Sequence, residues 1–147
     1  MGDIIIDSDA RILIEPGVYT AVLTHHETNN VAFKGQPKVY LRFVLIDPGV
    51  MGTKLYAAFN VKEILGKPGR NGRIRLTHRQ DLMLQLARLQ PNLRADRISL
   101  KPLHNREMKV QVRTVTSDSK QRPLPDSLKY SVVSDLISLE PELTHDQ

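Results

Sequence analysis

Apolar and polar residues alternate along several short stretches of the chain, with the two-residue period of a β-strand. The clearest stretch is 38–47, in which Leu41 and Phe43 would line a core while Tyr40 and Arg42 point the other way. Residues 53–61 and 108–116 alternate in the same manner. Together with β-rich runs at 18–26 and 128–137, the pattern predicts five strands.

One segment follows the period of an α-helix instead. Thr77 and Gln80 have the spacing of a capping box, Leu82 and Leu86 recur on one helical face, and Pro91 would end the helix. Polar, glycine- and proline-containing segments at 27–37, 62–75 and 117–127 are typical of loops, and we expect 62–75 to be a flexible basic loop. The predicted order is therefore three strands, one helix and two strands.

This order predicts a mainly β protein, a five-stranded OB-fold barrel with one helix between strands three and four. A five-stranded sandwich or an SH3-like barrel would show similar alternation, so the prediction depends on the position of the helix. We expect residues 1–14 to form an N-terminal arm or edge strand, 15–139 the OB-fold domain and 140–147 a short acidic tail.

Composition fits one globular domain: the chain has 147 residues, of which 40% are hydrophobic and 25% charged. The absence of cysteine excludes disulfides, thiolate metal sites and cysteine nucleophiles. No apolar run approaches the roughly 20 residues of a membrane span, and the N-terminal sequence does not look like a secretory signal. These features favour a cytoplasmic protein, in a bacterial host cell if the resemblance below holds.

Positive charge is concentrated in the middle of the chain. The net charge is +5, yet residues 62–113 hold 13 basic and four acidic residues, and acidic residues gather toward both ends. A basic body between acidic termini is typical of a protein that binds a polyanion. The alternative is a solvated surface that is basic without a function.

No motif in the sequence indicates catalysis, a metal or a cofactor. His25 and His26 are adjacent in a predicted strand, so their side chains would diverge, and the other histidines lie far apart along the chain. The glycine-rich stretch 66–72 lacks the Gly-Lys-Ser/Thr ending of a nucleotide-binding loop, and no serine occupies a nucleophile elbow. We therefore expect a protein that is not an enzyme.

The outward residues of the second and third strands supply the chemistry that an unpaired nucleic-acid strand requires. Tyr40 and Tyr56 offer ring faces on which bases can stack, and Arg42 and Lys54 offer charge for phosphates. The flanking loops and the glycine-rich segment add further candidates: Phe33, Lys34, Lys38, Lys67, Arg70, Arg73, Arg75, Lys120 and Arg122. The alternative is that the tyrosines only pack against cross-strand neighbours and the arginines only keep a loop soluble.

Several segments resemble the single-stranded DNA-binding proteins of phages and other mobile elements, a divergent OB-fold family. They are EPGVY at 15–19, the glycine loop at 34–35, YLRFVL at 40–45, the turn with Gly52, and LYAAFNV at 55–61. The similarity covers about 15–139. It implies sequence-tolerant binding of single-stranded DNA in replication or recombination. Bacterial-type members end in an acidic tail with a terminal hydrophobic residue, whereas this tail is short and ends in Gln147.

The sequence thus leads to one main hypothesis: a non-catalytic protein that coats and protects single-stranded DNA without sequence specificity. Its partners would be single-stranded DNA or RNA, a second copy of the chain in a homo-oligomer such as a dimer, and replication or recombination proteins. Two alternatives stay open. One is a structural or protein-interaction barrel within a larger assembly, and the other is an OB domain that binds RNA.

Overall fold

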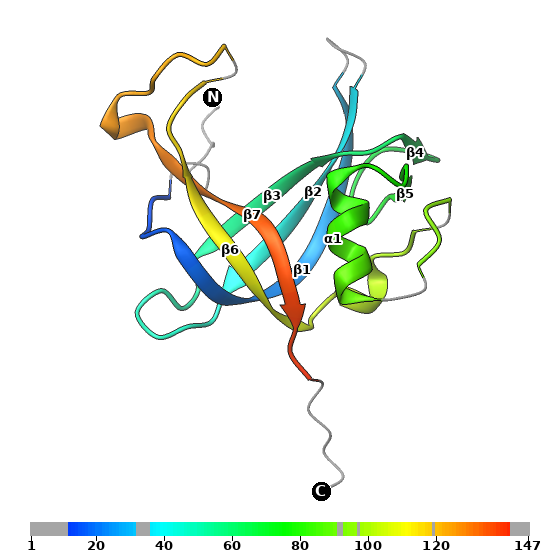
Figure 1. The fold of residues 1–147 in the computed structure, drawn as a ribbon, viewed down its shortest axis with the longest axis horizontal. Helices are drawn as coiled ribbons and strands as arrows, with labels where there is room; N and C mark the ends of the chain where they lie inside the picture. The colour runs from blue at the N-terminus through cyan, green and yellow to red at the C-terminus, as the bar shows by residue number, and fades with distance from the viewer. Residues whose placement is uncertain (1–11, 32–35, 91–92, 97, 119, 142–147) are drawn as a thin grey trace, which may run out of the picture.

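The computed structural model describes residues 12–31, 36–90, 93–96, 98–118 and 120–141. It confirms a mainly β protein with one α-helix. Five strands form one antiparallel sheet in the order β3-β2-β1-β6-β7 (Figure 1). Each of the five predicted runs overlaps one of these strands, which are β1 (Gly17–Val31), β2 (Gln36–Leu45), β3 (Lys54–Asn60), β6 (Glu107–Val115) and β7 (Tyr130–Leu139).

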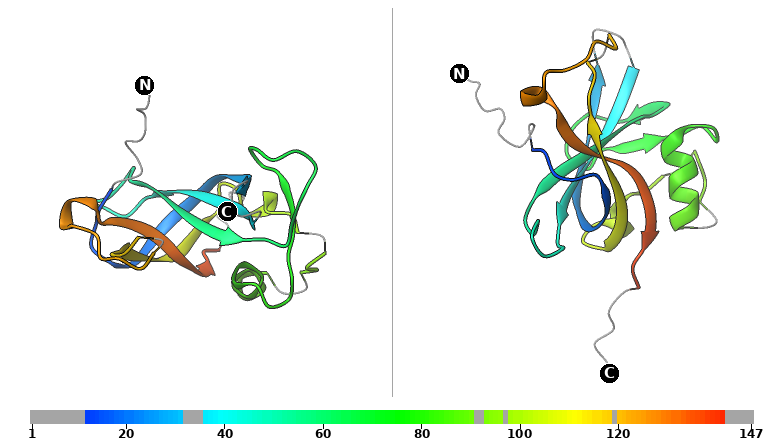
Figure 2. Two further views of the ribbon diagram at one scale, coloured as in Figure 1. Left: turned by 90° about the horizontal axis from the view of Figure 1, so that it is seen from above. Right: turned by 60° about the vertical axis from the view of Figure 1, so that its left-hand side comes forward.

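The predicted closure into a barrel is wrong, because β3 and β7 are the two edges of the sheet. The sheet is strongly curved, so its edge strands β3 and β7 lie near each other (Figures 1 and 2). The helix α1 (Asp81–Leu89) packs against both strands. Its Gln85 is buried, accepts a hydrogen bond of 2.7 Å from the Leu136 amide and so satisfies the backbone of β7. A side chain from the helix therefore bonds to the backbone of the edge strand β7.

The core lies on the concave side of the sheet and follows the predicted alternation. Leu41, Phe43 and their same-phase neighbours on the other strands are almost fully buried, and Leu82 and Leu86 bring the apolar stripe of α1 against them. Burial of each such side chain contributes about 1.5–3 kcal/mol.

A bulge in β1 reverses the side chains that face the core. The pairing of β1 with β2 shifts between Leu23 and His25. Leu23 is buried before the bulge, whereas His26 and Thr28 are buried after it. An extra residue in one strand has this effect because side chains alternate with a period of two. The bulge therefore turns His25 toward the outer face of β2 and His26 toward the interior.

The prediction of a loop at 62–75 is wrong in part. The segment contains a two-stranded hairpin of β4 (Glu63–Leu65) and β5 (Arg73–Arg75). Strands of three residues are too short to show alternation in a sequence. Between them the chain docks on β1, where the Thr28 amide donates to Gly69 O at 2.9 Å and the Asn71 amide donates to His26 O at 2.6 Å. A β-carbon on Gly72 would collide with the Thr28 hydroxyl, so this close approach requires glycine.

The capping box at Thr77 and Gln80 forms only by half. The Thr77 amide donates to Gln80 Oε1 at 3.0 Å, but the helix begins at Asp81 and its N-cap is Gln80, which makes no side-chain cap bond. The helix and the β4–β5 hairpin lie at one end of the molecule (Figures 1 and 2). The β2–β3 turn and the β6–β7 loop lie at the other end.

Shorter pieces complete the fold. Two 3₁₀ turns, η3 (Lys101–Leu103) and η4 (Asp126–Leu128), precede β6 and β7. The predicted N-terminal arm contacts β7 at its described end, where the Ser131 amide donates to Ile12 O at 2.8 Å and the Ile14 amide to Ser131 Oγ at 2.9 Å. Among the described residues, no helix combines the length and the apolar character that crossing a membrane requires.

Candidate nucleic-acid interface

Five of the predicted site residues, Lys38 among them, share the outer face of β2 and β3. The register pairs Arg42 with Tyr56, and Tyr40 and Lys54 lie one position away on the same face. Their neighbours along the strands, such as Leu41 and Leu55, are buried in the core. The two tyrosines are therefore neither inside the molecule nor on opposite walls.

An arginine lies beside both tyrosine rings. The ring centroids of Tyr40 and Tyr56 are 6.0 Å apart and the rings are tilted by 58°. The guanidinium carbon of Arg42 is 5.9 Å from the centroid of Tyr40 and 5.4 Å from that of Tyr56. These are cation–π distances, and at an exposed site each such contact contributes about 0.5–1 kcal/mol. The arrangement holds two ring faces and one positive charge within the span of neighbouring bases.

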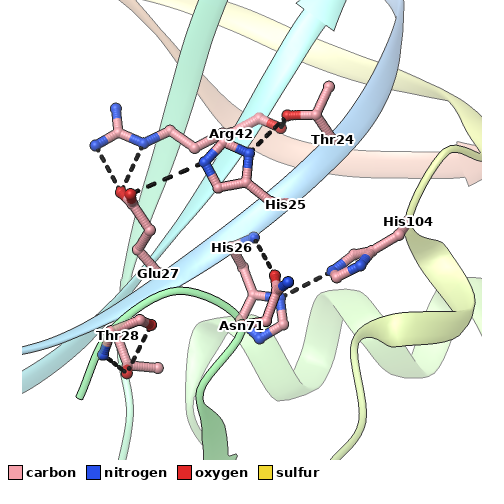
Figure 3. Close-up of polar contacts among 9 residues, drawn as sticks. Thr24, His25, His26, Glu27, Thr28, Arg42, Asn71 and His104 are labelled. Atoms are coloured by element: carbon pink, nitrogen blue, oxygen red, sulfur yellow. Dashed lines mark hydrogen bonds and ion pairs between the residues drawn. The ribbon is translucent and has the colours of Figure 1, made fainter.

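Glu27 balances the positive charge of Arg42. Sequence reasoning did not include Glu27 in the site. Glu27 Oε1 lies 2.9 Å from Arg42 Nη2 and accepts a bond of 3.0 Å from Arg42 Nε (Figure 3). His25 approaches the same carboxylate at 3.9 Å and contacts Thr24 Oγ1 at 3.0 Å. Glu27 falls at the start of the predicted 27–37 loop, but it continues β1. The only sequence signal was the continued alternation of His25 and Glu27.

Tyr56 also contacts β7. Tyr130 on β7 lies close to the Tyr56 hydroxyl group, and the Tyr56 ring is half-buried. Burial raises the pKa of the Tyr56 phenol above its ordinary value, and the neighbouring Tyr130 raises it further. The phenol is therefore neutral at physiological pH and does not repel phosphates. Alternation could not predict this pair, because Tyr56 and Tyr130 lie on strands that are far apart along the chain.

A hollow of about 410 Å³ adjoins Tyr56. Its walls include Thr24, Glu27, Arg42, Lys54 and Tyr56. Lys54 is exposed. The hollow offers a polar surface beside the rings, with cationic, anionic and hydroxyl groups for a ligand's polar edge.

The cations of the glycine-rich segment do not gather at one place. The docked segment sets Arg70 opposite Glu27 in an isolated bridge between β1 and residues 69–72, and Arg70 is exposed. Arg75 makes an ion pair of 2.6 Å with Glu63, and Arg73 borders a separate hollow with Asn71. Arg70 thus lies near the tyrosine face, whereas Arg73 and Arg75 do not join it.

Of the remaining candidates, Lys38 lies on β2 and the other described ones come from connecting segments. Lys38 Nζ donates to Asn60 Oδ1 at 2.7 Å, and Lys67 and Lys120 are exposed. Arg122 Nε donates to Asp118 Oδ2 at 2.9 Å. Phe33 and Lys34 lie outside the described residues.

Two histidines, His26 and His104, form a pair behind the face. His26, only 3% exposed, has Nε2 at 2.8 Å from Gly72 O and Nδ1 at 2.9 Å from His104 Nε2 (Figure 3). A carbonyl oxygen only accepts, so Nε2 of His26 carries the hydrogen and its Nδ1 accepts from His104. Burial lowers the pKa of both imidazoles. Sequence spacing did not suggest this pair, and among the described residues no three His, Cys, Asp or Glu side chains gather to hold a metal ion.

Comparison with models of known protein families finds no match, and comparison with curated protein sequences finds none either. The geometry of the site therefore carries the functional argument.

Proposed function

We propose that this protein binds single-stranded DNA, without sequence specificity and without catalysis, on the outer face of β2 and β3. A coat of this kind serves replication or recombination, and the resemblance in sequence suggests a phage or mobile element. RNA stays an alternative ligand, because stacking and phosphate contacts serve both nucleic acids.

The proposal includes an OB-type architecture in an open form. Two features support it: the strand order β3-β2-β1-β6-β7 and the helix between the third and fourth long strands. In such a fold the face of the second and third strands is the usual ligand platform.

One observation carries the function: Tyr40 and Tyr56 lie 6.0 Å apart on an outer face, with the Arg42 guanidinium within 6 Å of both rings. Bases stack on any ring face, so such a platform tolerates every sequence.

The decisive experiment is a competition for the purified protein between oligo-dT, duplex DNA and oligo-rU, read by fluorescence anisotropy of a labelled oligo-dT. We expect oligo-dT to compete far better than duplex, and its affinity to fall steeply as salt rises. Binding of oligo-rU alone would assign the protein to RNA. No binding of any oligonucleotide at low salt would refute the proposal and favour the protein-interaction alternative.

A further inference from the structure

The gap between β3 and β7 forms a groove that borders the proposed platform and shares Tyr56 with it. Its volume is about 780 Å³, and residues of both edge strands line it. The lining includes Lys38, Tyr56, Arg113, Val115, Tyr130 and Val132.

The outer face of β2 and β3 continues across this groove into the outer face of β6 and β7. On β6 the buried residues are Met108, Val110 and Val112, so Arg113 and Val115 have the outward phase. The register pairs Val115 with Tyr130. Because Tyr130 and Tyr56 line the same groove, the outward residues of β6 and β7 continue the face of β2 and β3.

Three tyrosines consequently follow one another across three strands: Tyr40 on β2, Tyr56 on β3 and Tyr130 on β7. The first two rings lie 6.0 Å apart, and the second and third line the same groove. The row runs across the strands rather than along one of them. A row of this kind suits successive bases of one unpaired strand.

The groove carries charges of both signs. Its lining includes the cations Lys38 and Arg113 and the carboxylates Asp81, Asp118 and Asp135. Arg122 compensates the charge of Asp118, whereas Asp135 accepts bonds from the neutral Gln85 and Ser134 and keeps its charge. Arg113 is exposed, and no acidic side chain among the described residues forms an ion pair with it, so a phosphate can reach its guanidinium group.

We propose that the bound strand crosses this groove, with Tyr130 as a third stacking platform and Arg113 as a phosphate contact. The inference rests on the proposed function and names the path of the ligand beyond the β2–β3 face. The unclosed edge of the sheet is then part of the binding surface.

Charge removal tests the phosphate contact. Arg113→Ala should lower the steepness of log K against log salt by about 0.7, the value for one phosphate contact on a single strand. Arg88→Ala is the matched control, because Arg88 is exposed on α1 and carries the same charge away from the groove. Equal salt slopes for Arg113→Ala and Arg88→Ala would overturn the path.

Ring removal tests the stacking platform. Tyr130→Ala should weaken binding of oligo-dT at least fivefold, whereas Tyr130→Phe keeps a ring and should bind within twofold of the parent protein. Melting temperatures of both variants confirm that they are folded. Parent-like binding by Tyr130→Ala, with weakened binding by Tyr40→Ala/Tyr56→Ala, would overturn the inference while leaving the proposed function intact. Failure of the parent protein to bind would refute both.

Photo-cross-linking of the unaltered protein provides a measurement independent of folding. An oligonucleotide with 5-iodo-deoxyuridine should cross-link to Tyr130 as well as to Tyr40 or Tyr56, identified by mass spectrometry of the peptides. Cross-links confined to the β2–β3 tyrosines would contradict a path across the groove.

Discussion

At the scale of single residues, the candidate interface is a balance between ring faces and charges. Arg42 contacts two tyrosines and one carboxylate, so Glu27 cancels part of the positive charge where a phosphate would approach. The same carboxylate fixes the guanidinium in place. Stacking therefore provides the larger share of the expected affinity at this point, and phosphate attraction the smaller.

Loss of both tyrosine rings should abolish most of the affinity that stacking provides. Tyr40→Ala/Tyr56→Ala is expected to weaken oligo-dT binding by about 1–3 kcal/mol per stacked base. Tyr40→Phe/Tyr56→Phe keeps the rings and is the control, which should bind nearly as the parent does. Anisotropy titrations measure both. Equal weakening in the two double variants would show that the phenol groups, and not the ring faces, make the contact.

Removal of the carboxylate should have the opposite effect. Glu27→Gln releases Arg42 from its ion pair, so affinity should rise and the dependence on salt should steepen by about one phosphate contact, a slope change near 0.7. Titrations at several salt concentrations provide the slope. Weaker binding by this variant would mean that Glu27 acts mainly by holding Arg42 in position.

At the scale of elements, the docked segment 69–72 connects the β4–β5 hairpin to β1. It makes backbone bonds to His26 and Thr28, and it carries Arg70 to the edge of the tyrosine face. The close approach at Gly72 is the feature on which this docking depends.

Gly72→Ala should therefore destabilise the protein. Overpacking against Thr28 is expected to cost about 1–3 kcal/mol in the free energy of unfolding, measured with denaturant. Thr28→Ala removes the colliding hydroxyl, so the double variant should lose less stability than the two single losses added together. Strict additivity would show that the clash is relieved elsewhere.

The sequence predicted elements well where a core face is long. Leu41 and Phe43 indicate a strand because every second residue is buried. The strands β4 and β5 have only three residues each, which is too short for a recognisable alternation. The pairing of Arg42 with Glu27 depends on the register between strands and on the β1 bulge, neither of which alternation specifies. The closure of the sheet into a barrel was mispredicted for a similar reason. Alternation shows which face of a strand is buried, but it does not show which strands pair with each other.

At the scale of the whole molecule, the pair of His26 and His104 links β1 to two segments that are distant in the sequence. His26 lies on β1, His104 follows η3, and the Gly72 carbonyl belongs to the docked segment. One hydrogen lies between the two imidazoles, and burial favours the neutral form of His26, whose Nδ1 accepts it. A proton added to His26 would place a charge on a buried ring.

The stability of the protein should consequently fall in acid. Burial lowers the pKa of His26 from its ordinary value of 6.5, and the neighbouring His104 lowers it by a smaller amount. Burial also lowers the pKa of His104, and the positive charges of Lys101 and Arg70 lower it further. His25 on the outer face shifts in the same direction through burial and Arg70. A histidine with a lowered pKa in the folded state binds its proton more readily when unfolded. Its contribution is complete above about pH 6.5 and is lost as the pH falls through and below that value, by at most about 1.4 kcal/mol per pH unit for each histidine.

Denaturant unfolding between pH 8 and pH 5 measures this loss. His104→Gln offers His26 an amide donor that does not titrate, so this variant should show a shallower decline than the parent. His78→Gln changes an exposed histidine and should leave the decline as it is. A parent protein that is equally stable at both pH values would show that the pair accepts a proton without breaking, and that the link between β1, η3 and the docked segment does not depend on a neutral His26.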